Sequence, residues 1–238
     1  MLKTDKSQFV NKMQFHGRRK GHSLSARQKA LLENSLPKLA LAINTSDADE
    51  IDLNAVFGRA PSPFWFEIGF GKGEHIAEQA KQNPNVNILG CEPFINGVVG
   101  LLDILDKTPL TNVRIYPDDA RNVMTRLPDA CVDKVFLLHP DPWPKNRHEG
   151  RRFISQENLQ YLSRIMKDGA ELRVGTDQTH YARWVMTQIY KQADFTWCAD
   201  SIDSWRVRPD NWPETRYQQK ATKEGIEPVY LRFKRNHR

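Results

Sequence analysis

The chain has few cysteines and no long apolar run. Its 238 residues include three cysteines, which lack the CxxC spacing of a redox or metal site. Cys91 and Cys131 lie in apolar segments, so we expect buried free thiols and a reducing, cytoplasmic setting. No stretch of about 18 apolar residues is present and the N-terminus is polar, so we expect neither a membrane span nor a signal peptide. The seven histidines form no HxxxH pair, and we expect no metal site.

Positive charge is concentrated at the two ends of the chain. Residues 1–40 hold nine lysines and arginines against two acids, and residues 206–238 hold nine against four. The two ends therefore carry net charges of +7 and +5. Since the whole chain has a net charge of +6, the centre must carry −6. Such ends fit either a solvated charged surface or the electrostatic footprint of a polyanion. The basic, glycine-punctuated stretch 15–22, FHGRRKGH, predicts a mobile arm over residues 1–22.

Short apolar runs alternate with stretches of helical spacing from residue 64 onwards. This alternation indicates parallel βαβ units in a doubly wound sheet with helices on both faces, closed by an antiparallel C-terminal strand. Before residue 64 we expect a helix over 25–42 and a polar link over 45–63. Residues 168–169 are predicted to end the helix that begins at residue 155, and residues 199–227 to form a polar loop. Strands are predicted at 64–68, 86–91, 113–116, 132–138, 170–174, 195–198 and 229–234, and helices at 74–82, 95–106, 120–126, 155–166 and 180–192.

A glycine-rich turn follows the first predicted strand. In residues 67–74, EIGFGKGE, the glycines Gly69, Gly71 and Gly73 make a tight strand-to-helix turn that a ligand can approach closely. Glycine triplets also occur in ordinary turns that need a positive φ, so this motif alone is a weak signal. The GxGxG spacing and the nearby acids favour S-adenosylmethionine over a dinucleotide, because a carboxylate repels a pyrophosphate and attracts a sulfonium.

Two further acids follow the next two predicted strands. Glu92 comes 19 residues after Gly73, at the strand end where a carboxylate accepts hydrogen bonds from ribose hydroxyls. Asp119 follows the third strand, where a carboxylate can bind an adenine amine or simply cap the next helix. Because the carboxyl ends of parallel strands meet at one edge of the sheet, we expect these acids and the glycine turn to lie together.

The most informative stretch is Val135–Arg152, VFLLHPDPWPKNRHEGRR. A buried strand breaks at PDPWP, residues 140–144, which cannot continue a strand or a helix. Asp141 is therefore held on a stiff loop beside a large aromatic ring and a basic stretch, an arrangement that suits an anionic substrate with a flat base. The alternatives are that Asp141 only shapes the turn, that Trp143 is a surface packing residue, and that the basic stretch is a solvated loop.

These motifs resemble the bacterial tRNA (guanine-N7)-methyltransferases of the TrmB type over nearly the whole chain. The PDPW corner followed by lysine and an arginine pair is the most specific part of the resemblance. The other matching motifs are the early basic segment 17–19, the glycine turn 67–74, GCEP at 90–93, DA at 119–120, GTD at 175–177 and TRY at 215–217.

The resemblance implies a role for each matching residue. Asp141 would be the active-site carboxylate, and the residues that would contact S-adenosylmethionine are Glu67, Gly69, Gly71, Gly73, Glu92, Asp119 and Asp141. The substrate tRNA would be bound by Lys145, Asp177, Thr215, Arg216, Tyr217 and Gln218, with further contacts from Arg18, Arg19, Arg151 and Arg152. Gln218 departs from the family, which usually has an acid there, and Asp177 could instead cap the helix that follows it.

The implied fold is a Rossmann-like class I methyltransferase. Residues 1–44 would form a basic arm and helix, and residues 45–238 a single catalytic domain with 199–227 as a substrate-binding region. The implied reaction is methylation of guanosine N7 at position 46, in the tRNA variable loop, with no metal and with the oligomeric state left open. The alternatives are a methyltransferase acting on another RNA or on a nucleobase amine, a non-enzymatic RNA-binding module, and, least favoured by the glycine spacing, a nicotinamide dehydrogenase.

Overall fold

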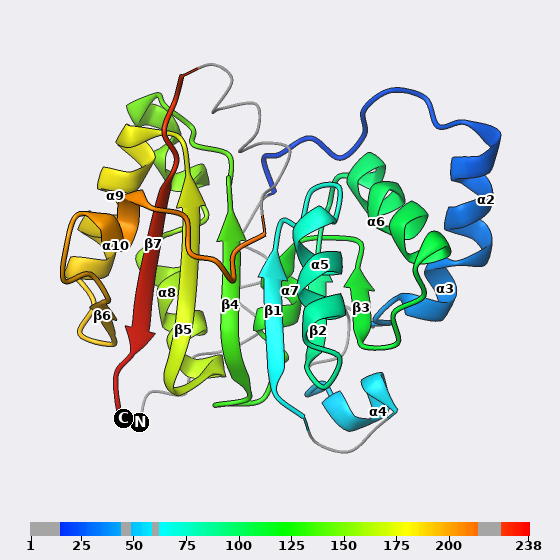
Figure 1. The fold of residues 1–238 in the computed structure, drawn as a ribbon, viewed down its shortest axis with the longest axis horizontal. Coiled ribbons are helices and arrows are strands. Elements are labelled where there is room, and N and C mark those ends of the chain that lie inside the picture. Colours follow the sequence, from blue (N-terminus) through cyan, green and yellow to red (C-terminus); the bar gives the residue numbers. More distant parts are fainter. Residues whose placement is uncertain (1–14, 44–48, 59–61, 214–224) are drawn as a thin grey trace.

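A seven-stranded sheet forms the centre of the computed structural model, which describes residues 15–43, 49–58, 62–213 and 225–238 (Figure 1). The strand order is β3-β2-β1-β4-β5-β7-β6. Strands β1 to β5 pair in parallel, and β7 runs antiparallel to both β5 and β6. The predicted α/β class and the antiparallel last strand are therefore confirmed. The strands are β1 (Phe64–Ile68), β2 (Asn87–Cys91), β3 (Val113–Tyr116), β4 (Val132–Leu138), β5 (Met166–Thr176), β6 (Phe195–Trp197) and β7 (Val229–Arg235).

Helices cover one face of the sheet along most of its width. Apolar side chains that alternate along the strands, such as Phe66, Val135 and Leu172, form the largest core cluster with helices α7, α8 and α9. Helices α5 and α6 cover the β1–β3 half of the other face, and Leu31 of α2 packs into the same cluster. These helices are α2 (Ala26–Asn34), α5 (Glu74–Gln82), α6 (Ile95–Lys107), α7 (Ala120–Met124), α8 (Gln156–Ile165) and α9 (Thr179–Tyr190).

A loop covers the other half of that second face. The segment that follows α10 (Asp203–Arg206) crosses in front of β5 and β4 (Figure 1). It inserts Trp212, only 1% exposed, into a small apolar cluster with Phe136 and Tyr230. The burial of Trp212 therefore holds this loop firmly on the sheet. In the sequence, the loop comes just before the predicted tRNA-binding residues 215–218.

Four local predictions are wrong, each for a local reason. The predicted helix 25–42 ends as α2 at Asn34, because Pro37 has no backbone N–H to continue it and instead lies in the first turn of a separate short helix, α3 (Leu36–Leu39). The predicted polar link contains α4 (Leu53–Phe57), whose N-terminus is capped by the Asp52 carboxylate. Residues 168–169 do not stop a helix but lie within β5, beside a shift in its register with β4. The loop 199–227 contains α10, and a 3-10 helix, η1 (Asn146–Arg151), follows the PDPW corner.

The described end of the basic arm is bound to the domain rather than free. The carbonyl of Arg19 accepts a hydrogen bond from the Ile95 backbone, and Asn96 is hydrogen-bonded to both Gly21 and His22. Residues 15–22 are therefore attached to the start of α6, and the prediction of a mobile arm is wrong for this part of it. The remainder of that arm, residues 1–14, lies outside the described residues.

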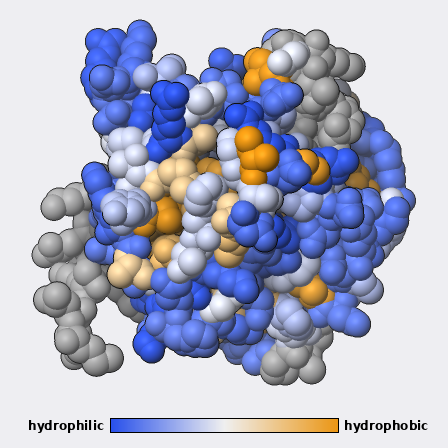
Figure 2. Space-filling model, turned by 60° about the vertical axis from the view of Figure 1, so that its left-hand side comes forward, coloured by the Kyte–Doolittle hydropathy of each residue, from blue (hydrophilic) through white to orange (hydrophobic). Residues whose placement is uncertain are grey.

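The surface at the β6 end of the sheet is mostly hydrophilic, with apolar side chains in a few small areas (Figure 2). All three cysteines are free, and Cys91 is buried whereas Cys131 is half-buried. In the described part of the chain, no helix is long and apolar enough to cross a membrane. Nor do the described residues place three or more His, Cys, Asp or Glu side chains where they could hold a metal ion.

Candidate active site

A cavity of about 1110 Å³ opens at the carboxyl edge of the sheet. The ends of β1, β2 and β4 form its floor, and the start of α7 and residues 15–18 form part of its wall. Its volume is slightly above the range of roughly 300–1,000 Å³ for small-molecule sites, so there is room for a nucleoside and a second flat group. The cavity therefore lies where open α/β sheets bind ligands.

The glycine turn lies against this cavity and needs glycine for two different reasons. Gly69, Gly71 and Gly73 all have positive φ, at 72°, 58° and 85°, a conformation that other residues rarely adopt. A Cβ on Gly69 would meet no atom within 4 Å, so this backbone is open to a ligand. Gly73 does not line the cavity; a Cβ there would lie 2.5 Å from the Cβ of Leu101, so Gly73 allows α5 and α6 to pack closely.

Glu92 is fixed at the end of β2 by two backbone hydrogen bonds. Its carboxylate accepts from the Gly71 N–H at 2.7 Å and from the Phe94 N–H at 2.8 Å, and the residue is 7% exposed. Burial raises the pKa of Glu92 to about 7, against the lowering effect of these N–H donors, and the charges of Asp141 and Glu67 raise it further. Hydroxyl donors or a cationic ligand would therefore stabilise the ionised form of Glu92.

Glu67 and Asp119 are also on the cavity, and both already have partners in the protein. Glu67 is 2% exposed and lies 2.7 Å from Nδ1 of His75. Asp119 caps α7 through the Arg121 N–H at 3.0 Å and also binds the Arg121 guanidinium. The capping alternative is thus realised for Asp119, and any adenine amine would share its oxygens with Arg121.

The PDPW corner is held by strained backbone and by a buried arginine. His139, directly before the corner, and Trp143, its last residue, have positive φ of 49° and 40°, and such strain persists where the surroundings impose it. Arg152 donates to the carbonyls of Pro142 and Trp143 at 3.1 and 3.0 Å and stacks on the Trp184 ring. Asp141 is exposed and lines the cavity, so the loop presents its carboxylate to a ligand.

Cationic and aromatic side chains form the rim of the cavity next to this corner. The Arg151 guanidinium lies 5.0 Å from the centre of the Trp143 ring, and the rings of His148 and His16 meet the same ring edge-on. Partial desolvation, followed by the positive charges of Arg151 and its neighbours, lowers the pKa of His148. This concentration of positive charge suits a polyanion.

The predicted tRNA contacts divide into residues that line the cavity and residues that do not. Arg152 lines the cavity but is 6% exposed, and its guanidinium holds the corner through the Trp143 carbonyl. Arg19 forms an ion pair with Asp118 at 2.7 Å, whereas Arg18 lines the cavity. Lys145 is exposed but is not part of the cavity wall.

Asp177 also lies off the cavity, and it does not cap α9. The N-cap residue of that helix is Gln178, which makes no capping bond through its side chain. Asp177 lies instead 4.0 Å from Nδ1 of His139. The pKa of His139 is lowered, because burial outweighs the opposing effect of the Asp177 carboxylate. The remaining predicted contacts, Thr215, Arg216, Tyr217 and Gln218, lie outside the described residues.

His75 and His16 are site residues that the sequence patterns did not single out. His75 lies in the first turn of α5, directly after the glycine turn, and this position was the available signal. His16 reaches the cavity from the N-terminal segment, more than 100 residues before Trp143 in the sequence, and no local pattern reveals that contact.

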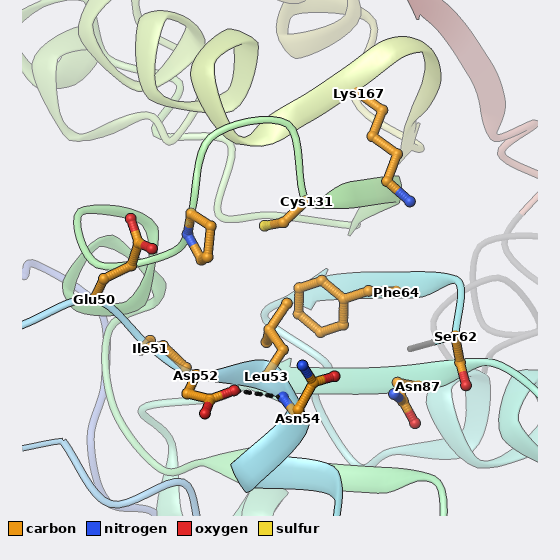
Figure 3. Close-up of a pocket in the computed structure, with 11 residues that line it drawn as sticks. Glu50, Ile51, Asp52, Leu53, Asn54, Ser62, Phe64, Asn87, Cys131 and Lys167 are labelled. Carbon is orange, nitrogen blue, oxygen red and sulfur yellow. Dashed lines mark hydrogen bonds between the residues drawn. The ribbon is translucent and has the colours of Figure 1, made fainter. Parts of the chain in front are cut away.

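A second cavity, of about 460 Å³, lies at the opposite, amino edge of the sheet (Figure 3). Its main polar groups have partners: Asp52 caps α4, and Lys167 binds the Asp133 carboxylate at 2.8 Å. The two edges therefore differ: among the described residues, only the carboxyl edge combines a ligand-accessible glycine turn with acids that face a cavity.

The carboxyl-edge site fits S-adenosylmethionine. Gly69 leaves a backbone cradle that a side chain would fill, Glu92 is set to accept from hydroxyls, and the acids around it suit a cationic sulfur. Together with the strand order, this site defines a class I methyltransferase dependent on S-adenosylmethionine.

Comparisons with known proteins agree with this class. Residues 61–230 match a methyltransferase family model, Methyltransf_4. The tRNA (guanine-N(7)-)-methyltransferase of Zymomonas mobilis is 44% identical over 220 residues, which cover 92% of this chain and 93% of that protein. The enzyme of the same name from Jannaschia sp. is 45% identical over 225 residues, 93% of this chain and 94% of the relative. The chain belongs to the tRNA (guanine-N(7)-)-methyltransferase family.

A solved structure agrees with the fold. The 16S rRNA methyltransferase KamB superposes with a TM-score of 0.56 at 15% identity, over 79% of this chain and 96% of KamB. At this level of identity the likeness concerns the fold alone.

Proposed function

We propose that this protein transfers a methyl group from S-adenosylmethionine to N7 of a guanosine in tRNA, at position 46 of the variable loop, in the cytoplasm. The observation that carries the proposal is that Asp141 of the PDPW corner and Glu92 line one cavity, below a basic and aromatic rim. The names of its relatives, which act on guanine N7 of tRNA, support the same substrate.

The reaction requires little acid–base catalysis from the protein. When bound, S-adenosylmethionine supplies a methyl group on a sulfonium that is open to direct displacement, with neutral S-adenosylhomocysteine as the leaving group. Guanine N7 has a free lone pair and no proton, so no side chain has to act as a base. The protein's main contribution is to hold the base in position. Asp141 would stabilise the positive charge that develops on the guanine ring as it is methylated.

The rim suits a base presented outside a regular helix. N7 lies on the major-groove edge, which an A-form helix makes inaccessible to side chains. An unstacked loop base could enter the cavity beside Trp143, while Arg18 and Arg151 contact phosphates. Binding of this kind would weaken with salt.

Product analysis tests the proposal. The protein would be incubated with labelled S-adenosylmethionine and unmodified tRNA, and the labelled nucleoside identified after digestion. We expect 7-methylguanosine from the variable loop, formed far more slowly by the Asp141→Ala variant. A different methylated nucleoside would still show a methyltransferase, but it would contradict guanine N7 as the atom that is methylated.

A further inference from the structure

A chain of buried hydrogen bonds leads away from the cofactor end of the cavity. It starts at Glu67, which is 2% exposed and accepts from Nδ1 of His75 at 2.7 Å. His75 is 1% exposed, and its ring also packs edge-on against Phe136, with the ring centres 4.7 Å apart. The ring is therefore fixed in orientation as well as in hydrogen bonding.

Gln79, one turn further along α5, continues the chain. Its amide nitrogen lies 2.9 Å from the Asn211 carbonyl and 3.3 Å from Nε2 of His75. A carbonyl oxygen only accepts, so the amide atom facing Asn211 must be the nitrogen, and its second hydrogen points to His75. Nε2 of His75 is then the acceptor, and Nδ1 carries the proton that is donated to Glu67.

The far end of the chain is the loop that covers β4 and β5. Arg173, 3% exposed, donates to the same Asn211 carbonyl at 3.2 Å and stacks on the ring of Trp212, 5.5 Å away. Trp212 in turn packs on Tyr230. Thr215, the first residue of the predicted tRNA-binding segment, follows Trp212 by three positions.

We infer that Glu67, His75, Gln79 and the Asn211 carbonyl form a relay that couples the cofactor site to the loop 207–213, and through this loop to tRNA binding. His75 is a positioning residue that orients Glu67 toward the cavity. Gln79 does not line the cavity and acts only by linking His75 to the loop. A ligand against Glu67 restrains this carboxylate further, and through these three hydrogen bonds it restrains the loop 207–213 at Asn211; the inference rests on the tRNA substrate proposed above.

Gln79→Leu breaks the relay at its centre, and Gln82→Leu is the matched control. Gln82 lies on the same helix, is exposed, and its amide binds Glu78 of that helix. The measurement is the affinity for unmodified tRNA with and without saturating S-adenosylhomocysteine. We expect S-adenosylhomocysteine to tighten tRNA binding about tenfold in the wild type and in Gln82→Leu. In Gln79→Leu this factor should fall close to one.

The outcomes separate coupling from mere stability. If Gln79→Leu melts at a lower temperature but keeps the full coupling factor, the contact is only structural and the relay is overturned. A wild-type protein that binds tRNA without any coupling also overturns it. A wild-type protein that does not bind tRNA at all would instead defeat the proposed function.

The unaltered protein offers a second test that does not depend on how a variant folds. With ¹⁵N-labelled histidine, the signal of His75 should report a proton on Nδ1 and should shift when tRNA binds, although His75 is 1% exposed. The His75→Gln variant identifies that signal by removing it. A proton on Nε2, or a signal that tRNA leaves in place, contradicts the relay.

Discussion

The two halves of the active-site cavity are built in opposite ways. In the cofactor half, Glu67 and Glu92 are 2% and 7% exposed and are hydrogen-bonded within the protein. In the base half, Asp141 is exposed on a strained loop, and Arg151 lies over the Trp143 ring at the rim. The cofactor half is thus preorganised by the fold, whereas the base half offers charge and a flat ring to a large partner.

This difference predicts how the two halves respond to change. Buried acceptors with fixed partners should control cofactor affinity and its dependence on pH. Exposed cations should control tRNA affinity and its dependence on salt. Asp141 lies between the cofactor half and the base half. Its loss should reduce turnover strongly and should change the affinities for cofactor and for tRNA only slightly.

The largest effect is expected from Asp141→Ala. Loss of the carboxylate removes stabilisation of the cationic guanine product, and a reduction in kcat of about 10²–10³-fold is expected. Affinity for S-adenosylhomocysteine, measured by calorimetry, should change little because Glu92 and the glycine turn remain. Asp141→Asn, which keeps the shape without the charge, should be nearly as inactive; wild-type turnover in either variant would remove Asp141 from the chemistry.

A smaller effect is expected from Glu92→Gln. This variant keeps the size of the side chain but loses the charge and places an amide nitrogen near one of the two N–H donors that Glu92 binds. A hydrogen bond to a charged group contributes about 1.5–3 kcal/mol, so the Kd for S-adenosylhomocysteine should rise at least tenfold. The affinity for tRNA alone should stay unchanged, and an unchanged cofactor Kd would exclude Glu92 from the site.

Cofactor affinity should fall below neutral pH. The pKa of Glu92 in the free protein is raised to about 7, so this carboxyl is mostly protonated at pH 6. Hydroxyl donors and a cationic sulfur favour the ionised form, so binding lowers this pKa and releases a proton. Affinity should therefore rise between pH 6 and 8 and then level off, with a slope of at most about tenfold per unit at the acid end. Calorimetry in buffers of different ionisation enthalpy measures the released proton, and Glu92→Gln should abolish this release.

The smallest effect is expected from Arg151→Gln. Removing one exposed cation at the rim should raise the Kd for tRNA a few-fold and reduce the salt slope of binding by about 0.7–0.9. The Kd for S-adenosylhomocysteine should not change. Arg183→Gln, an exposed arginine of α9 that does not line the cavity, is the control and should leave both unchanged. Equal losses in the two variants would point to general charge rather than to the rim.

The same contrast decides what could be predicted from the sequence. The strands, the glycine turn and the acids at the strand ends are local patterns with fixed geometry, so β1 and β4 are predicted with their observed bounds. The partners of these residues are not local. Arg152 reads as one cation of a basic loop, and only the folded loop shows that it is buried against the Pro142 carbonyl. The contact between Gln79 and Asn211 joins residues 132 positions apart, which no periodicity reveals.

The most direct test of the two-part site uses tRNA in which 7-deazaguanosine replaces the guanosine at position 46. The substituted nucleotide keeps the shape of guanosine and its phosphates, but its base has a C–H group in place of N7 and so lacks the N7 lone pair. We expect the substituted tRNA to bind with an affinity within about twofold of normal and to receive no methyl group. Methyl transfer to the substituted tRNA at the normal rate would contradict guanine N7 as the acceptor and Asp141 as the group that stabilises its product.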